Sequence, residues 1–305
     1  MKQWIVKDIV PLLLEAGRIA MDYIDNPGTA IKEDRTPVTA ADKAVENFLT
    51  ARLEDEASGI RLIGEETSSS KSETYLRDAL RGSSWIVDPI DGTVLFANKI
   101  PMWGTSVAFS QGGKLREGAV YVPSTGEMLL SDSGTVLYAR DAASGTGASS
   151  AGASAPEGFV SEASEKFLRL LKPLARPELR FDDSSIINLS QRLVRQGGIR
   201  CANTVHSLCS SVYSGILLAT GRHGASVMGA KLWDIAGCLP ALKNLGFYMC
   251  MPDGRDVLSL EISPSIYDLD FSSKRAFALH ELTVCAPTRQ IAEQVSAFCG
   301  LGKGK

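Results

Sequence analysis

Two carboxylates lie three positions apart at the end of an apolar run, in Trp85-Ile86-Val87-Asp88-Pro89-Ile90-Asp91-Gly92-Thr93. Strands that are apolar throughout are usually buried on both faces, and charges at the mouth of such a strand are costly unless they are paired or bound to a metal. Pro89 restricts the chain between the aspartates, and Gly92 lets the backbone approach a ligand closely. The N–H groups of Gly92 and Thr93 are placed to meet an anion. The segment therefore predicts a buried strand that ends in a metal site and a phosphate-binding turn.

Three further motifs carry carboxylates that suit the same site. These motifs are Thr39-Ala40-Ala41-Asp42, Gly64-Glu65-Glu66 and Trp233-Asp234-Ile235-Ala236-Gly237. Mg²⁺ prefers oxygen ligands, mostly carboxylates and waters. Two such cations ~3.5–4 Å apart supply a nucleophilic water, neutralise phosphate oxygens and stabilise a leaving oxygen. The combined pattern predicts Mg²⁺-dependent hydrolysis of a phosphate monoester, which is among the slowest reactions without a catalyst.

Each motif taken alone also has an ordinary structural explanation. Asp42 completes a Thr-x-x-Asp capping box, Asp234 precedes an amphipathic helix as an N-cap does, and Glu65-Glu66 suits a solvated loop. A structural turn is the alternative for Asp88 and Asp91, but two carboxylates that close a buried strand need a counter-charge. The capping and catalytic roles of Asp42 are compatible. The co-occurrence of the four motifs therefore favours the metal site.

The four motifs together resemble the inositol monophosphatase-like family of Mg²⁺-dependent, lithium-sensitive phosphatases, and they follow that family's order and approximate spacing over most of the chain. Asp-Pro-Ile-Asp-Gly-Thr is the most specific of them. The resemblance implies an α+β fold, a layered α/β/α/β/α sandwich of the inositol monophosphatase and fructose bisphosphatase type. It also implies a homodimer that hydrolyses a small phosphorylated metabolite with a metal-activated water. The implied cofactor is Mg²⁺, as two or more ions, with Mn²⁺ as a possible substitute.

The resemblance further implies a role for each site residue. Asp88 would bridge two ions, and the implied metal ligands are Glu65, Glu66, Asp88, the Ile90 carbonyl, Asp91 and Asp234. Glu66 is the weakest of these, because it would bind through water or only support the others. The implied catalytic residues are Asp42, Glu65 and Thr93, of which Asp42 and the Thr93 hydroxyl orient and deprotonate the attacking water. The implied phosphate and substrate contacts are Asp91, Gly92, Thr93, Ser210, Val227 and Lys231.

Departures from the family pattern concern the substrate. Counted back from Trp233-Asp234, the acidic residue that holds inositol hydroxyls falls on Val227, which cannot accept hydrogen bonds. Pro101-Met102-Trp103-Gly104-Thr105 is more similar to the histidinol-phosphate phosphatase branch. Lys231 lies three residues before Asp234 and would meet an anionic group, unless it is a solvated surface lysine. An inositol phosphate, histidinol phosphate and another sugar or nucleotide phosphate all remain as substrates, and we expect poor activity on inositol 1-phosphate.

Two other functions fit part of the pattern. Haloacid-dehalogenase-like phosphatases carry Asp-x-Asp-Gly-Thr after an apolar strand, but the aspartates here are one residue further apart. The Gly-Glu-Glu and Trp-Asp motifs would also have no role there. A catalytically idle regulator that binds metal or phosphate is the non-enzyme alternative, and the presence of all the central ligands argues against it.

The elements that must position these residues fall into two parts. We expect an N-terminal α+β domain over 1–141, a flexible linker over 142–158 and a C-terminal α/β domain over 159–305 that supplies Asp234. The linker is expected because its Ala, Ser, Gly and Thr residues cannot bury enough surface to order the segment. Helical spacing predicts helices over 5–24, from Thr39, and around 167–174, 208–217, 235–245 and 291–295. Alternation broken by turns predicts an antiparallel meander over 105–138, and short strands are predicted at 61–63 and 282–285.

Composition limits the class of protein. The 305 residues are 44% apolar and 22% charged with a net charge of −3, which is typical of a soluble globular protein. We expect no nucleic-acid partner, because no basic stripe with interleaved aromatics is present. We expect no membrane association, because the run Ile9–Leu14 is too short to span a bilayer and the start lacks a signal-peptide layout. The six cysteines form no Cys-x-x-Cys pair, so a reducing cytoplasm is expected.

Overall fold

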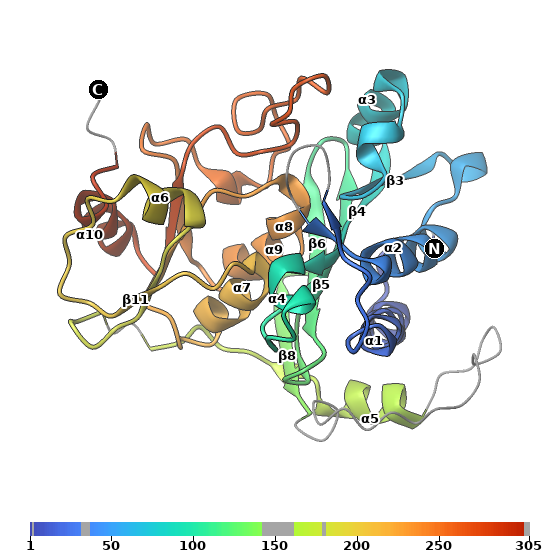
Figure 1. Ribbon diagram of the computed structural model, residues 1–305, viewed down its shortest axis with the longest axis horizontal. Helices are drawn as coiled ribbons and strands as arrows, with labels where there is room; N and C mark the ends of the chain where they lie inside the picture. The colour runs from blue at the N-terminus through green and yellow to red at the C-terminus, as the bar shows by residue number, and fades with distance from the viewer. Residues whose placement is uncertain (2, 32–36, 142–161, 179–180, 302–305) are drawn as a thin grey trace.

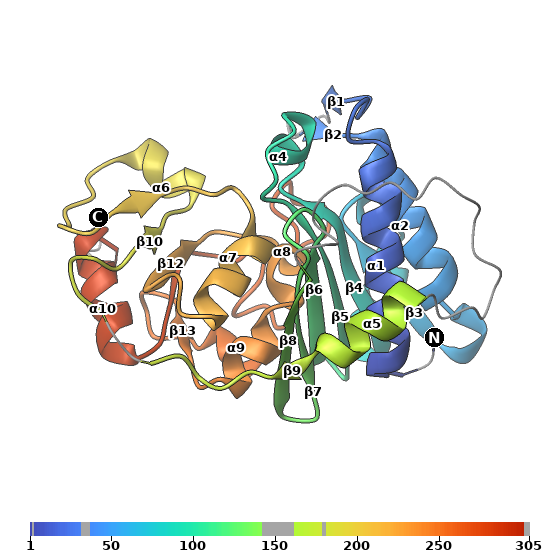
Figure 2. The ribbon, with the colours of Figure 1, turned by 90° about the horizontal axis from the view of Figure 1, so that it is seen from below.

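The structure is a computed structural model of the chain, and it describes residues 1, 3–31, 37–141, 162–178 and 181–301. Its helices and sheets alternate in five layers (Figure 2). Helices on the outer face of the larger sheet are α1 (Val6–Asp22) and α2 (Ala40–Leu53). Helices between the two sheets are α7 (Ser211–Ala219), α8 (Leu232–Ala236) and α9 (Leu239–Asn244). Helix α10 (Arg289–Phe298) covers the smaller sheet, so the predicted α/β/α/β/α sandwich is confirmed.

The larger sheet has seven strands in the order β3-β4-β5-β6-β7-β8-β9. Their bounds are β3 Ile60–Gly64, β4 Ser83–Asp91, β5 Gly104–Gln111, β6 Leu115–Val122, β7 Glu127–Asp132, β8 Thr135–Arg140 and β9 Lys172–Pro173. Strands β5 to β8 are the predicted meander, and β3 and β4 run parallel through α3 (Glu73–Arg81). Side chains alternate between two apolar clusters, with Trp85 and Val87 toward α1 and α2 and Ile86 toward α7 to α9. The strands read as apolar throughout because helices cover both faces.

The smaller sheet has five strands in the order β11-β10-β12-β14-β13. Their bounds are β10 Ile187–Asn188, β11 Val205–His206, β12 Ala225–Met228, β13 Tyr248–Cys250 and β14 Thr283–Ala286. Of these strands, only β14 was expected from the sequence. Further elements are the strand pair β1 (Ala30–Ile31) and β2 (Pro37–Val38), and the short helices α4 (Thr93–Ala97) and α6 (Gln191–Gln196).

One helix prediction needs correction. The single helix expected over 235–245 is two helices, α8 and α9, separated at Gly237-Cys238. Pro240 explains the new start, because proline is tolerated in a first helical turn but not in a helix interior. Gly246 follows α9 with φ +74°, as expected for a helix C-terminus.

The chain returns to the larger sheet before it enters the smaller one. Helix α5 (Glu162–Leu170) packs against α1, and β9 pairs with β8. The linker expected at 142–158 lies outside the described residues, so the division into two domains stays a prediction. Among the helices that the structure describes, none is long and apolar enough to cross a membrane.

Candidate metal and phosphate site

Glu65 and Asp88 are brought together by the parallel pair β3 and β4. Gly64 lies opposite Val87 in this pair, so the two strands end at the same edge of the sheet. The Glu65 N–H donates to the Val87 carbonyl at 3.3 Å, which continues the pairing by one residue. Glu65 therefore stands beside Asp88 although 22 residues of chain separate them.

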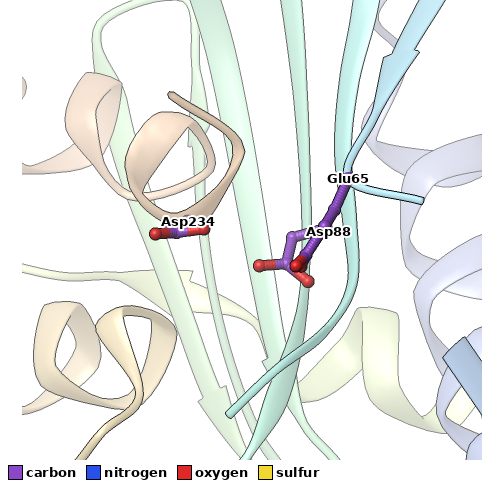
Figure 3. A group of neighbouring side chains, drawn as sticks. All are labelled: Glu65, Asp88 and Asp234. Carbon is purple, nitrogen blue, oxygen red and sulfur yellow. The ribbon is translucent and has the colours of Figure 1, made fainter. Parts of the chain in front are cut away.

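Asp234 reaches the same place from the middle layer. Helix α8 packs against β4 and β5. It begins at Leu232, so Asp234 lies inside its first turn, and Asp234 Oδ2 accepts the Lys231 N–H at 2.8 Å. The N-cap alternative for Asp234 is therefore wrong. Figure 3 shows this aspartate facing Glu65 and Asp88 across the gap between helix and strand.

These three carboxylates form a group that suits a hard divalent cation. Each offers an oxygen, and the three oxygens lie within 4.8 Å of one another. Asp88 is only 1% exposed, and its Oδ1 has no hydrogen-bond partner among the residues that the structure describes. A buried carboxylate oxygen without a partner is costly, and metal coordination removes that cost. Because Mg²⁺ prefers carboxylate ligands, the donor set fits the cation that the sequence predicted.

The electrostatics of the group favour a cation as well. Burial raises the pKa of Asp88 well above its ordinary range, and the charges of Glu65, Asp91 and Asp234 raise it further. The pKa of Asp234 is raised by burial and then by Glu65 and Asp91. Burial raises the pKa of Asp91 to about 6, against hydrogen bonds from Ser210 and α7 that lower it. A bound cation would reverse the repulsion among these carboxylates.

Asp91 is hydrogen-bonded to the start of α7 and is not one of the three clustered carboxylates. Its Oδ2 accepts hydrogen bonds from the Ser210 hydroxyl at 2.5 Å and from the Val212 N–H at 2.8 Å. Ser210 is also the N-cap of α7, where its Oγ accepts the Tyr213 N–H at 3.1 Å. The Ser210 hydroxyl therefore joins the end of β4 to the start of α7. A direct contact of Ser210 with substrate stays a prediction.

Gly92 lies in a turn whose backbone conformation favours glycine. Its φ is +93°, in the left-handed region that side chains rarely adopt. A Cβ there would lie 3.4 Å from the Cys209 carbonyl oxygen and 3.3 Å from Leu95, which leaves little free space. The turn leads directly into α4, which begins at Thr93. Phosphate binding by this turn stays a prediction.

Asp42 caps a helix and also contacts Thr93, while its catalytic role stays a prediction. It forms the capping box of α2, where Oδ2 accepts the Thr39 N–H at 2.7 Å and the Thr39 hydroxyl at 2.5 Å. Its Oδ1 lies 3.3 Å from Thr93 Oγ1, which also lies 3.2 Å from the Ile90 carbonyl oxygen. The Thr93 hydroxyl donates to one or the other. The structure thus brings Asp42, Ile90 and Thr93 together at the end of β4.

Val227 is not brought to this site. It is fully buried in the apolar cluster between the smaller sheet and α10. Its neighbours on β12 point the other way, where Ser226 bonds to Asn188 and Asn188 to Ser214 of α7. Because strand side chains alternate between faces, counting residues back from Asp234 could not show which face position 227 occupies. The expected substrate contact at Val227 is therefore not supported by this structure.

Lys231 lies near the carboxylate group. It is partly exposed, and its ammonium group lies 5.2 Å from the centre of the Trp233 ring. Its charge lowers the pKa of Asp234, against the larger effects of burial and the neighbouring acids. Whether this lysine meets an anion or is only solvated stays open, and a substrate contact stays a prediction.

Comparison with known proteins agrees with these motifs. The model of the inositol monophosphatase family matches residues 3–296. The chain belongs to this family. Histidinol-phosphatase of Chlorobaculum parvum is 27% identical over 239 residues, which is 76% of this chain and 80% of that protein. Human inositol monophosphatase 1 is 30% identical over 127 residues, which is 41% of this chain and 45% of that protein. A solved IMPase of Thermotoga maritima has a TM-score of 0.63 at 17% identity, covering 96% of this chain and 95% of that chain, so it shares the fold.

The site of this family member includes a buried acid, Glu46, that the sequence analysis missed. Glu46 is 1% exposed, and its carboxylate accepts the Glu66 N–H at 2.9 Å and the Thr67 N–H at 2.8 Å. A Cβ on Gly64 would lie 2.5 Å from this carboxyl group, which explains the glycine of Gly-Glu-Glu. Glu46 anchors the turn that carries Glu65 and Glu66. The available signal was an acid next to Val45 on the apolar face of the predicted helix.

Glu46→Gln is expected to destabilise this turn. Glutamine offers only one acceptor oxygen, so the Glu66 or Thr67 N–H would face its amide nitrogen and lose a buried hydrogen bond. We expect a loss of about 1–3 kcal/mol in the free energy of unfolding, measured in urea, together with weaker Mn²⁺ binding. Glu73→Gln, at an exposed acid of α3, is the control and should change stability by less than about 0.5 kcal/mol. Equal stability and metal binding in the two variants would contradict the anchoring role.

Proposed function

We propose that this chain hydrolyses a small phosphate monoester in a Mg²⁺-dependent reaction. The observation that carries the proposal is the meeting of Glu65, Asp88 and Asp234, with the buried Asp88 Oδ1 left without a partner among the described residues. Burial, together with repulsion among the carboxylates of this group, raises the pKa values of Asp88 and Asp234. A structural role would not need that cost, whereas a cation site does.

The residues of the chain would divide the work as follows. Glu65, Asp88 and Asp234 would hold the cation, with Asp91, the Ile90 carbonyl and Glu66 as further ligands. When bound, Mg²⁺ supplies charge that neutralises phosphate oxygens and lowers the pKa of a coordinated water. The Thr93 hydroxyl would orient the attacking water. It would accept a proton from that water and donate its own proton to Asp42 Oδ1. The N–H groups of Gly92 and Thr93 would bind the phosphate, and Lys231 would meet an anionic part of the substrate.

We propose histidinol phosphate as the preferred substrate over inositol 1-phosphate. Two observations support this choice. The histidinol-phosphatase match extends over most of both chains, whereas the human inositol monophosphatase match covers less than half of either. The segment Pro101-Met102-Trp103-Gly104-Thr105 is also more similar to the histidinol-phosphate phosphatase branch. In a pocket that offers no partner to inositol hydroxyls, their burial would cost roughly 1–3 kcal/mol.

The test is phosphate release with Mg²⁺ on a panel of histidinol phosphate, inositol 1-phosphate, sugar phosphates and nucleotides. We expect kcat/KM for histidinol phosphate to exceed that for inositol 1-phosphate by about one to two decades, which corresponds to that cost. Inositol 1-phosphate as the best substrate would overturn the choice of substrate. Metal binding without phosphate release from any ester would favour the regulator alternative.

The family resemblance also implies properties that we keep as proposals. These are a homodimer, inhibition by lithium, Mn²⁺ as a substitute for Mg²⁺ and a cytoplasmic location. None of them is needed for the hydrolysis proposed above.

A further inference from the structure

Asp234 and Asp88 belong to different layers, so no strand pairing sets their separation. Asp88 is part of β4 in the larger sheet, whereas Asp234 is carried by the five-residue helix α8 in the middle layer. Their separation depends on the position of α8 relative to β4 and β5. Any group that fixes this position would also fix the geometry of the proposed cation site.

Ser106 makes the contact that fixes the position of α8 on the larger sheet. It lies on β5 directly opposite Asp88 of β4, and residues opposite one another in a strand pair share a face of the sheet. The Ser106 hydroxyl donates to the Trp233 carbonyl at 3.0 Å and accepts the Gly237 N–H at 3.2 Å. Trp233 directly precedes Asp234, and Gly237 directly follows α8. One hydroxyl beside Asp88 thus binds the backbone on both sides of Asp234.

Two glycines bring α8 close enough for these bonds. A Cβ on Gly237 would lie 2.6 Å from Ser106 Oγ and 2.7 Å from the Ala119 carbonyl oxygen. A Cβ on Gly118 would lie 2.5 Å from the Gly237 carbonyl oxygen. The end of α8 therefore packs closely against the backbone of β6 and against the Ser106 side chain of β5. Such a contact leaves little room for the helix to shift without breaking the Ser106 hydrogen bonds.

A serine suits this place for chemical reasons. A hydroxyl donates one hydrogen bond and accepts others, so it satisfies a carbonyl and an N–H together. It is neutral, and therefore it adds no charge beside the carboxylates of Asp88 and Asp234. Ser106 is fully buried, so it cannot contact substrate in this structure.

We propose that Ser106 is a positioning residue of the cation site, and that its hydroxyl sets the separation of Asp234 and Asp88. The inference rests on the proposed metal-dependent function. Loss of the hydroxyl would let α8 move and would leave the Trp233 carbonyl and the Gly237 N–H without their partner. Groups that orient metal ligands in this way typically change metal affinity about 10- to 100-fold when they are removed.

The same strand offers a matched control. Ser110 is fully buried, lies four residues along β5 on the same face, and forms a 2.8 Å hydrogen bond with Ser84 Oγ rather than with α8. Ser110→Ala thus removes a buried serine hydrogen bond from the same sheet without touching α8. Ser106→Cys leaves no cavity, because a thiol is somewhat larger than a hydroxyl, but it weakens the hydrogen bonds; it therefore separates the effect of a cavity from that of the hydroxyl.

The experiment measures Mn²⁺ binding to the full chain by electron paramagnetic resonance, alongside the free energy of unfolding in EDTA. We expect Ser106→Ala to weaken Mn²⁺ binding about 10- to 100-fold, Ser106→Cys to fall between it and the wild type, and Ser110→Ala to remain within about twofold. If Ser106→Ala does not fold, Ser106→Cys and Ser110→Ala still decide the comparison. Wild-type affinity in the Ser106 variants, or an equal loss in Ser110→Ala, would overturn the inference. Absence of Mn²⁺ binding by the wild type would instead overturn the proposed function itself.

Discussion

Asp88→Asn is expected to abolish phosphate-ester hydrolysis while the protein stays folded. Asp88 is the buried member of the group with Glu65 and Asp234, and its Oδ1 has no other described partner. The substitution replaces one ligand oxygen by an amide nitrogen and removes a charge that the cation needs. Because a bound cation supplies several kcal/mol of stabilisation to the transition state, we expect a loss of about 10³-fold or more in kcat/KM.

The measurement is phosphate release at saturating Mg²⁺, with urea unfolding of each variant to confirm the fold. Asp25→Asn, at an acid that is 96% exposed, serves as the control and should retain full activity. Without metal, Asp88→Asn should be at least as stable as the wild type, because it relieves repulsion among buried carboxylates. A folded Asp88→Asn protein with full activity would show that Asp88 is not a ligand.

Removal of Mg²⁺ with EDTA is expected to destabilise the wild type more at about pH 7.5 than at about pH 5.5. Burial and mutual repulsion raise the pKa values of Asp88 and Asp234, and burial raises that of Asp91 to about 6. The folded protein without metal therefore binds protons that the unfolded chain has already released. Proton binding by these aspartates therefore contributes to the free energy of unfolding of the metal-free protein. This contribution is fully present below the ordinary aspartate pKa of ~3.9, and it is lost as the pH rises through the raised pKa values.

The size of this stability change follows from the affinity for Mg²⁺. Mg²⁺ at about 100 times its Kd adds about 2.7 kcal/mol to the free energy of unfolding, and protons that compete for the carboxylates reduce this gain at the lower pH. The measurement is urea unfolding with and without EDTA across that pH range. Asp88→Asn is the comparison, because other titrating groups contribute equally to both proteins. Parallel pH curves for the two proteins would be evidence against a coupled carboxylate site.

The features that the sequence predicted are local in the chain. The apolar run before Asp88 predicts β4, Thr39 and Asp42 predict the start of α2, and alternation after Thr93 predicts the meander. Each of these depends on residues only a few positions apart, whose spacing follows the geometry of a helix or a strand. The family model matches residues 3–296, a range that contains these local motifs.

Only the tertiary structure decided which side chains meet. Asp234 lies beside Glu65 and Asp88 because α8 packs on the larger sheet. Asp91 accepts a hydrogen bond from Ser210, which is 119 residues away in the chain. Val227 faces the core beneath α10, because the two-residue alternation of its short strand is set by sheet pairing rather than by distance from Asp234. Glu46 showed in the sequence only as an acid on the apolar face of a helix, and Ser106 belonged to no motif. The roles of both consist of hydrogen bonds to distant backbone groups. The sequence by itself determined which chemical groups are available, because motifs depend on spacing along the chain. Packing between the layers decided the geometry of the candidate site, because contacts between layers join residues that local periodicity cannot relate.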